Sequence, residues 1–156
     1  MEQLLGHLWG DFVCQTDWMA LTKKKPGAMG WTAALVHALV YTLAVFGVLA
    51  LFSSKYSWQA LLVIWITHAI IDHYELVAKF IWARNWLSPR WITKALYIGG
   101  NSSPSSVWSV RNAPWGACKP KQGFHPERPE HLVWLIYIVI DNTLHLTINY
   151  AALRWL

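Results

Sequence analysis

Residues 30–52 read GWTAALVHALVYTLAVFGVLALF, a stretch of 23 residues with no formal charge and a single histidine. An apolar helix of about 20 residues crosses the hydrocarbon core of a bilayer, which is roughly 30 Å thick. The stretch therefore predicts a transmembrane helix. Charged residues make up only 13% of the chain, against about 25% in soluble domains, so the composition as a whole is that of a membrane protein.

Three further segments are apolar with a few polar interruptions. The run that begins at Trp58 is apolar up to Asp72 and continues as a mixed helix to about Trp86. Together with the first and last segments, this pattern predicts an all-α fold, a four-helix transmembrane bundle that forms a single domain over residues 1–156. The predicted helices cover residues 2–21, 29–52, 57–86 and 130–154.

The connection over residues 87–129 is longer than compact domains usually contain unless the loop has a function or is disordered. Its glycine, serine and proline content argues against regular structure, whereas Trp108, Trp115 and Phe124 argue against a simple linker. We expect this long loop to fold over the cytoplasmic face of the bundle as a cap.

The basic residues gather on one side of the predicted spans. Ten fall in the loop before residue 29 or in and beside the loop 87–129, whereas Lys55 and Arg154 lie on the other side. Cytoplasmic loops carry the excess of lysine and arginine, which predicts a multi-pass protein of the bacterial inner membrane with both termini outside. The net charge of +5 then follows from topology and does not indicate nucleic acid. The expected partners are membrane lipids and a small-molecule or lipid substrate, and a homo-oligomer stays open.

Three of the four aspartates lie four residues from a histidine, each pair within an apolar segment. Four residues make about one helical turn, so the two members of a pair share one helix face. The pairs are His7/Asp11, His68/Asp72 and Asp141/His145.

The order within the pairs supports a common site. The first and third segments read His before Asp, whereas the last reads Asp before His, and in an up-down bundle the last helix runs in the opposite direction. The inversion brings the three aspartates into one layer and the three histidines into the next. His37, in the second helix, falls near the aspartate layer.

Carboxylates and imidazoles are ligands of Zn²⁺, Mn²⁺ and Fe, and this ligand set is large enough for one or two ions. The predicted metal ligands are His7, Asp11, His37, His68, Asp72, Asp141 and His145. His37 and Glu75, which continues the stripe of the third segment, are the candidate catalytic residues. Nucleophile and phosphate-loop motifs are missing from the sequence, so any catalysis would come from metal-bound water.

Two alternatives to a metal site stay open. Histidines and aspartates of neighbouring helices could hydrogen-bond without a metal and hold the fold, or they could form a proton or cation pathway. An aspartate inside hydrocarbon costs about 2.5–3.5 kcal/mol on insertion scales. Three of them therefore call for compensation, which a metal would supply.

The segment HLWGDFVCQTDWM, residues 7–19, and the lysines that follow resemble the opening of a family of small uncharacterised membrane proteins of bacteria and their phages. His37, the His68-x-x-x-Asp72 pair and DNTLH at residues 141–145 also fit that family. The layout is more loosely similar to inner-membrane metal-dependent hydrolases, and this likeness implies hydrolysis. The predicted function is a membrane-embedded metal-dependent hydrolase of a phosphoester or ester, with a lipid among the candidate substrates. The alternative is a non-enzymatic membrane module that uses the cluster for structure or for ion or proton conduction.

Overall fold

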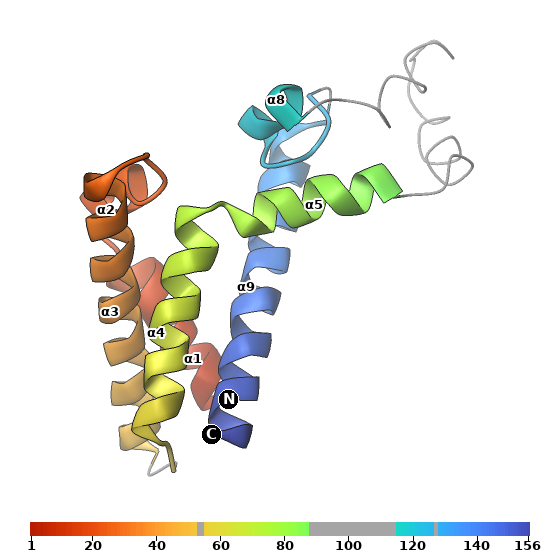
Figure 1. Ribbon diagram of the computed structural model, residues 1–156. Helices are drawn as coiled ribbons and strands as arrows, with labels where there is room; N and C mark the ends of the chain where they lie inside the picture. Colours follow the sequence, from red (N-terminus) through yellow and green to blue (C-terminus); the bar gives the residue numbers. More distant parts are fainter. Residues whose placement is uncertain (53–54, 88–114, 127) are drawn as a thin grey trace. The chain divides into compact units, whose positions relative to one another are not determined.

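The computed structural model describes residues 1–52, 55–87, 115–126 and 128–156, and within these ranges it consists of helices and turns without a strand (Figure 1). The all-α prediction is therefore confirmed. Contacts divide the chain into two compact units: unit 1 is Met1–Leu76 with Val139–Leu156, and unit 2 is Val77–Ile138. The two units are described separately below.

Two helices are long and apolar enough to cross a membrane, as the sequence predicts. They are α3, Ala28–Leu51, and α9, Glu130–Trp155. α3 begins directly after Gly27, whose φ of 85° is a left-handed conformation that favours glycine. The apolar run is therefore one uninterrupted helix, from Ala28 after the KKKPG break to Leu51.

The third predicted helix, residues 57–86, is not continuous. It divides into α4, Trp58–His73, and α5, Leu76–Leu87. Glu75, with a φ of 52°, adopts a left-handed conformation that ends α4. The pair counts as a third candidate span only if α4 and α5 together make one broken crossing.

The prediction of a single helix over residues 2–21 is also wrong. This segment comprises α1, Glu2–Leu8, the π-helical turn η1, Trp9–Val13, and α2, Asp17–Thr22. The chain is extended at Thr16, whose hydroxyl accepts a hydrogen bond from the backbone N–H of Met19 and so starts α2. None of these pieces has the length of a span, so the structure supports two or three membrane-spanning helices, not clearly four.

Two glycines let the first segment pack closely against α3. A Cβ atom on Gly6 would lie 2.9 Å from the Cα of Val45, and one on Gly10 would lie 2.5 Å from Cδ2 of Tyr41. Small residues four apart allow the backbones of neighbouring helices to approach in this way. The glycine spacing therefore fixes the line of contact between the first segment and α3.

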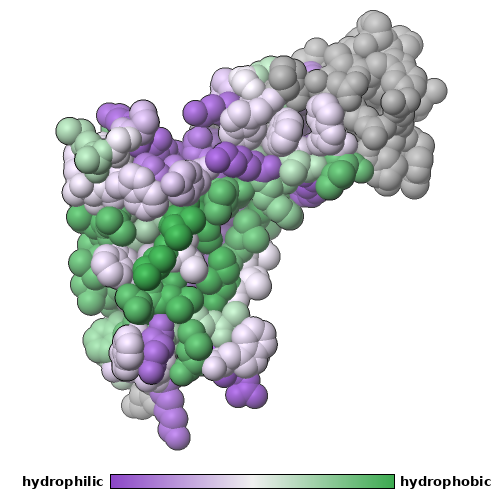
Figure 2. All heavy atoms as spheres, viewed as in Figure 1, coloured by the Kyte–Doolittle hydropathy of each residue, from purple (hydrophilic) through white to green (hydrophobic). Residues whose placement is uncertain are grey.

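Unit 1 has an apolar core and an apolar surface band. Its core is formed by α3, α4 and the end of α9 with the residues Tyr41, Val45, Leu49, Ala60, Ile64 and Ala152. α1 begins near the end of unit 1 where α3 finishes, and α2 lies where α3 begins (Figure 1). Hydrophobic side chains cover the middle of this unit and hydrophilic ones lie toward both ends (Figure 2). This distribution is that of a membrane-embedded unit.

In unit 2, part of the predicted loop has regular structure. It contains α8, Trp115–Cys118, and the short 3₁₀ helix η2, Lys119–Lys121. Gly123 lies so close to α5 that a Cβ atom would be 2.1 Å from the carbonyl oxygen of Ala78, and the neighbouring Phe124 is fully buried. These residues therefore fold against α5. The remainder of the predicted cap, residues 88–114 and 127, falls outside the described residues.

Candidate metal centre

Six of the seven predicted metal ligands form one cluster inside unit 1. Their side chains make three groups in which the potential ligand atoms all lie within 4.8 Å of one another. The groups are Asp11/His37/His68, His68/Asp72/His145 and Asp11/Asp141/His145. Residues from the beginning, middle and end of the chain thus meet at one place.

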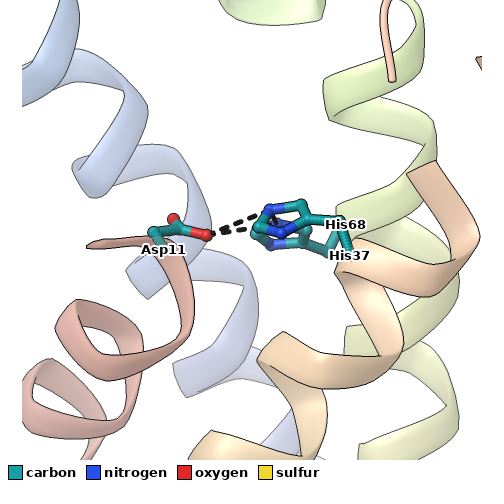
Figure 3. Close-up of side chains that lie close together, drawn as sticks. All are labelled: Asp11, His37 and His68. Carbon is teal, nitrogen blue, oxygen red and sulfur yellow. Dashed lines mark hydrogen bonds and ion pairs between the residues drawn. The ribbon is translucent and has the colours of Figure 1, made fainter. Parts of the chain in front are cut away.

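The first group joins η1, α3 and α4 (Figure 3). Oδ1 of Asp11 lies 3.3 Å from Nε2 of His37 and 3.4 Å from Nε2 of His68, and the two Nε2 atoms are 3.1 Å apart. A tetrahedral metal site with bonds of 2.0–2.1 Å has ligand–ligand distances of about 3.3 Å. The three atoms therefore have the spacing of one face of such a site.

Asp72 lies beside the same two imidazoles. Its Oδ2 atom is 3.3 Å from Nε2 of His37 and 3.4 Å from Nε2 of His68. The same oxygen accepts a hydrogen bond of 2.6 Å from the ammonium of Lys23, which also donates to Oε1 of Gln15 at 3.0 Å. Lys23 and Asp72 are almost fully buried. The cluster thus contains a lysine as well as carboxylates and imidazoles.

α9 contributes the third group. Nε2 of His145 lies 3.8 Å from Oδ1 of Asp141, one turn away on the same helix, and 3.7 Å from Oδ1 of Asp72. The His145 side chain is 2% exposed. The imidazole of this residue therefore faces carboxylates from two helices.

His7, the seventh predicted ligand, has a different set of partners. It is fully buried, and its Nδ1 atom lies 2.9 Å from the hydroxyl of Tyr41 and 3.5 Å from Oδ2 of Asp11. Its Nε2 atom is paired with the amide oxygen of Asn142. Because both ring nitrogens have protein partners, His7 is placed to orient Asp11.

Glu75, a predicted catalytic residue, does not belong to any of the three groups. It lies at the break between α4 and α5, where its carboxylate is 4.0 Å from the ammonium of Lys24. His37, the other predicted catalytic residue, lies within the first group. The helix break turns the chain away from the stripe that the sequence predicted, and this explains the difference.

The local backbone determines how Asp11 enters the cluster. Asp11 is the central residue of the π-helical turn, in which the N–H of Cys14 bonds to the carbonyl of Trp9. Isolated π-helical turns are rare and frequently occur at functional sites. Gly10 within the same turn allows contact with Tyr41, so the carboxylate of Asp11 reaches His37 on α3.

Several buried atoms of the cluster have no hydrogen-bond partner among the described residues. They are Oδ1 of Asp11, Nδ1 of His37 and of His68, and Nε2 of His145. Buried polar groups are nearly always paired, and a group without a partner requires an explanation such as an ion. Oδ1 of Asp11 and Nε2 of His145 both face the interior of the cluster, where an ion would satisfy them.

The sequence did not predict the roles of Tyr41 and Lys23. The hydroxyl of Tyr41 accepts a hydrogen bond of 2.6 Å from the amide of Asn149, and its ring stacks on His68 with centroids 3.9 Å apart. The sequence does contain a signal for Tyr41: it lies one turn after His37 in an apolar helix, a spacing that puts both side chains on one helix face. Lys23 gave no such signal, since it belongs to a run of three lysines that is typical of a cytoplasmic loop.

The fold and the cluster define a class: an α-helical membrane protein with a buried centre of histidines and aspartates. Residues 1–98 match the family described as a protein of unknown function, DUF3307, and the chain belongs to this family. The match includes His7 through Asp72 and ends before the pair on α9. It agrees with the resemblance to an uncharacterised family. No curated protein and no solved structure matches the chain.

Proposed function

We propose that this protein binds a divalent transition metal, Zn²⁺, Mn²⁺ or Fe²⁺, in the cluster and hydrolyses a phosphoester or ester, lipids included. The single observation that carries the proposal is the triangle of Asp11 Oδ1, His37 Nε2 and His68 Nε2, with sides of 3.1–3.4 Å. These are two nitrogens and one carboxylate oxygen, a ligand set found in catalytic zinc sites. Three protein ligands leave a further coordination position open for water or substrate.

The metal would supply a polarised water as the nucleophile. Side chains in and beside the cluster would hold the ligands in position and shield them from bulk water. His7 orients the carboxylate of Asp11 through its contact of 3.5 Å. Tyr41 stacks on His68 and fixes the plane of its ring. The imidazoles of His37, His68 and His145 are buried, and exclusion of bulk water strengthens electrostatic interactions within such a site.

We further propose that the protein lies in the bacterial inner membrane and that its first segment crosses the membrane with the other spans. The segment packs against α3 along Gly6 and Gly10 and extends from one end of unit 1 to the other (Figure 1). This arrangement supports four crossings with both termini outside.

Metal content and activity test the proposal together. Protein purified in mild detergent after expression with Zn²⁺, Mn²⁺ and Fe should contain at least about one equivalent of metal, and the metal content of His37→Ala and of His68→Ala should each fall by about one equivalent. His131→Ala, at an exposed residue outside the cluster, is the matched control. A chelator should abolish hydrolysis of p-nitrophenyl phosphate, p-nitrophenyl acetate or phospholipid vesicles, and added metal should restore it. Metal-free wild-type protein would refute the proposal.

A second candidate, proton or cation conduction, is favoured by the continuity of the polar contacts. Lys23, Asp72, His37, Asp11 and His7 form a chain in which each contact is between 2.6 and 3.5 Å. Buried chains of this kind serve as proton relays in membrane proteins. Proteoliposomes with a pH-sensitive dye inside distinguish the two functions, because a relay would dissipate an imposed pH gradient without any hydrolysis.

A further inference from the structure

The three ligand groups overlap in a way that limits which of them can bind ions together. The first and third groups share only Asp11, whereas the group His68/Asp72/His145 takes one imidazole from each of the others. A carboxylate has two oxygens and can bridge two ions, whereas a neutral imidazole binds one ion through one nitrogen. Only the first and third groups can therefore be filled at the same time.

We infer that the cluster is a two-metal centre bridged by the carboxylate of Asp11. One ion is bound by Asp11, His37 and His68, and the other by Asp11, Asp141 and His145. This inference rests on the proposed function and adds the number of ions, the bridging residue and the class of substrate.

The two oxygens of Asp11 have different neighbours, and the residue as a whole is shared by the first and third groups. Oδ1 lies 3.3 Å from Nε2 of His37, on the side of the first group. Oδ2 lies 3.5 Å from Nδ1 of His7, the residue that holds the carboxylate in place. In the third group, Nε2 of His145 is buried without a hydrogen-bond partner among the described residues. Each group thus has a buried, unpaired atom directed into the cluster.

This assignment leaves one carboxylate of the cluster without a metal ion, and that carboxylate already pairs with the ammonium of a lysine. Asp72 is the residue not used by the first and third groups, and its Oδ2 accepts from the ammonium of Lys23 at 2.6 Å. Lys23 competes with a metal for this oxygen and neutralises the buried charge. Asp72, predicted as a ligand from the sequence, is on this assignment the anchor of Lys23.

The charge of such a centre selects the substrate. Two divalent ions exceed the charge of the three carboxylates, and with Lys23 the centre has a net charge of about +2 that attracts anions. Two ions roughly 3.5–4 Å apart stabilise the attacking and leaving oxygens in phosphoryl transfer. Of the two substrate classes that the proposed function includes, the two-metal centre therefore favours an anionic phosphoester over a neutral ester.

Manganese loading provides the test, because Mn²⁺ is detected by both metal analysis and electron paramagnetic resonance. Wild-type protein in mild detergent should bind about two Mn²⁺ per chain, and bridged ions at roughly 3.5–4 Å should give a spin-coupled spectrum. Asp141→Asn should retain about one ion with the uncoupled six-line spectrum. Asp11→Asn should lose the coupling. Inorganic phosphate should change the coupled spectrum, whereas acetamide, a neutral carbonyl compound, should not at the same concentration.

The variant Lys23→Met/Asp72→Asn removes both charges of the buried pair and should still bind about two ions. His131→Ala is again the control for handling and expression. A wild type with a single uncoupled ion would overturn the two-metal centre and leave the proposed metal site intact, whereas a wild type without metal would refute the proposed function itself. Loss of one ion from the Lys23→Met/Asp72→Asn variant would make Asp72 a ligand and overturn the bridge assignment. Equal responses to phosphate and acetamide would overturn the substrate preference.

Discussion

The first segment, residues 2–22, and helix α3 lie against each other and have similar lengths, yet they contribute in different ways. α3 is an unbroken helix of 24 residues without a charged side chain, and it gives the cluster His37 and Tyr41. The first segment is divided into α1, η1 and α2, and it provides Asp11 from its π-helical turn. The continuous helix α3 thus provides a regular packing surface, and the broken first segment places the carboxylate of Asp11 against it.

The two segments differ because α3 has no charged side chain to pair, whereas the first segment must satisfy a buried carboxylate. An apolar helix satisfies its own hydrogen bonds and needs only packing. A buried carboxylate needs partners from other helices, and the π-helical turn with Gly10 positions Asp11 for His37 and His68. Irregular backbone is tolerated where protein covers it, as α3 covers the first segment here.

The largest effect is expected from Lys23→Met, which removes the cation that directly follows the first segment. The substitution leaves the buried carboxylate of Asp72 without its 2.6 Å partner, and breaking a buried ion pair costs about 3–5 kcal/mol. The free energy of unfolding in mild detergent, followed by tryptophan fluorescence, should fall by this amount. Lys25→Met, at an exposed neighbour, is the control. Equal stability of the two variants would contradict the buried pair.

Gly10→Ala should have the next largest effect, because a Cβ atom would lie 2.5 Å from Cδ2 and 3.0 Å from Cα of Tyr41. Overpacking of this kind costs about 1–3 kcal/mol. Gly47→Ala, on α3 with open space around it, should instead stabilise the helix by up to about 1 kcal/mol. The two variants are compared in the same unfolding assay. If their effects have the same sign, the first segment does not pack on α3 as described.

Tyr41→Phe should cost about 1–2 kcal/mol, since it leaves His7 and Asn149 without the hydroxyl that both contact. The ring that stacks on His68 remains, so binding of metal should weaken less than stability. Tyr150→Phe removes a hydroxyl from an exposed residue of α9 and should have no measurable effect. A Tyr41→Phe protein as stable as the wild type would exclude the hydroxyl as a link between the first segment, α3 and α9.

The smallest effect on stability is expected for single cysteines that report topology, made after both native cysteines are replaced by serine. If the first segment crosses the membrane alongside α3, Glu2→Cys and Lys55→Cys should react with an impermeant maleimide from one side. Lys24→Cys should react from the other side. Labelling of Glu2→Cys from the same side as Lys24→Cys would show that the first segment enters the membrane and returns.

The spacing and order of the three His/Asp pairs were enough to predict that Asp11, His68, Asp72, Asp141 and His145 meet, because one helical turn separates the members of each pair and the last helix runs in the opposite direction. The sequence did not reveal that His7 takes Tyr41 and Asn142 as partners, nor that Glu75 leaves the stripe. The partners of His7 lie far away in the sequence, and Glu75 leaves the stripe because the helix breaks beside it, an irregularity that hydrophobic periodicity does not register. The prediction of a single helix over residues 2–21 was wrong because the backbone of this segment is also irregular.

The sequence by itself determined the all-α class and the candidate spans α3 and α9, because predominantly apolar runs of this length have few alternatives to a membrane helix. Only the tertiary structure decided which polar groups pair. Lys23 reaches Asp72 across 49 positions of the chain, and Asp11 reaches His68 across 57. Such contacts depend on where the helices break and on how closely Gly6 and Gly10 let them approach. Local sequence preferences do not contain this information, since the partner is supplied by a distant segment.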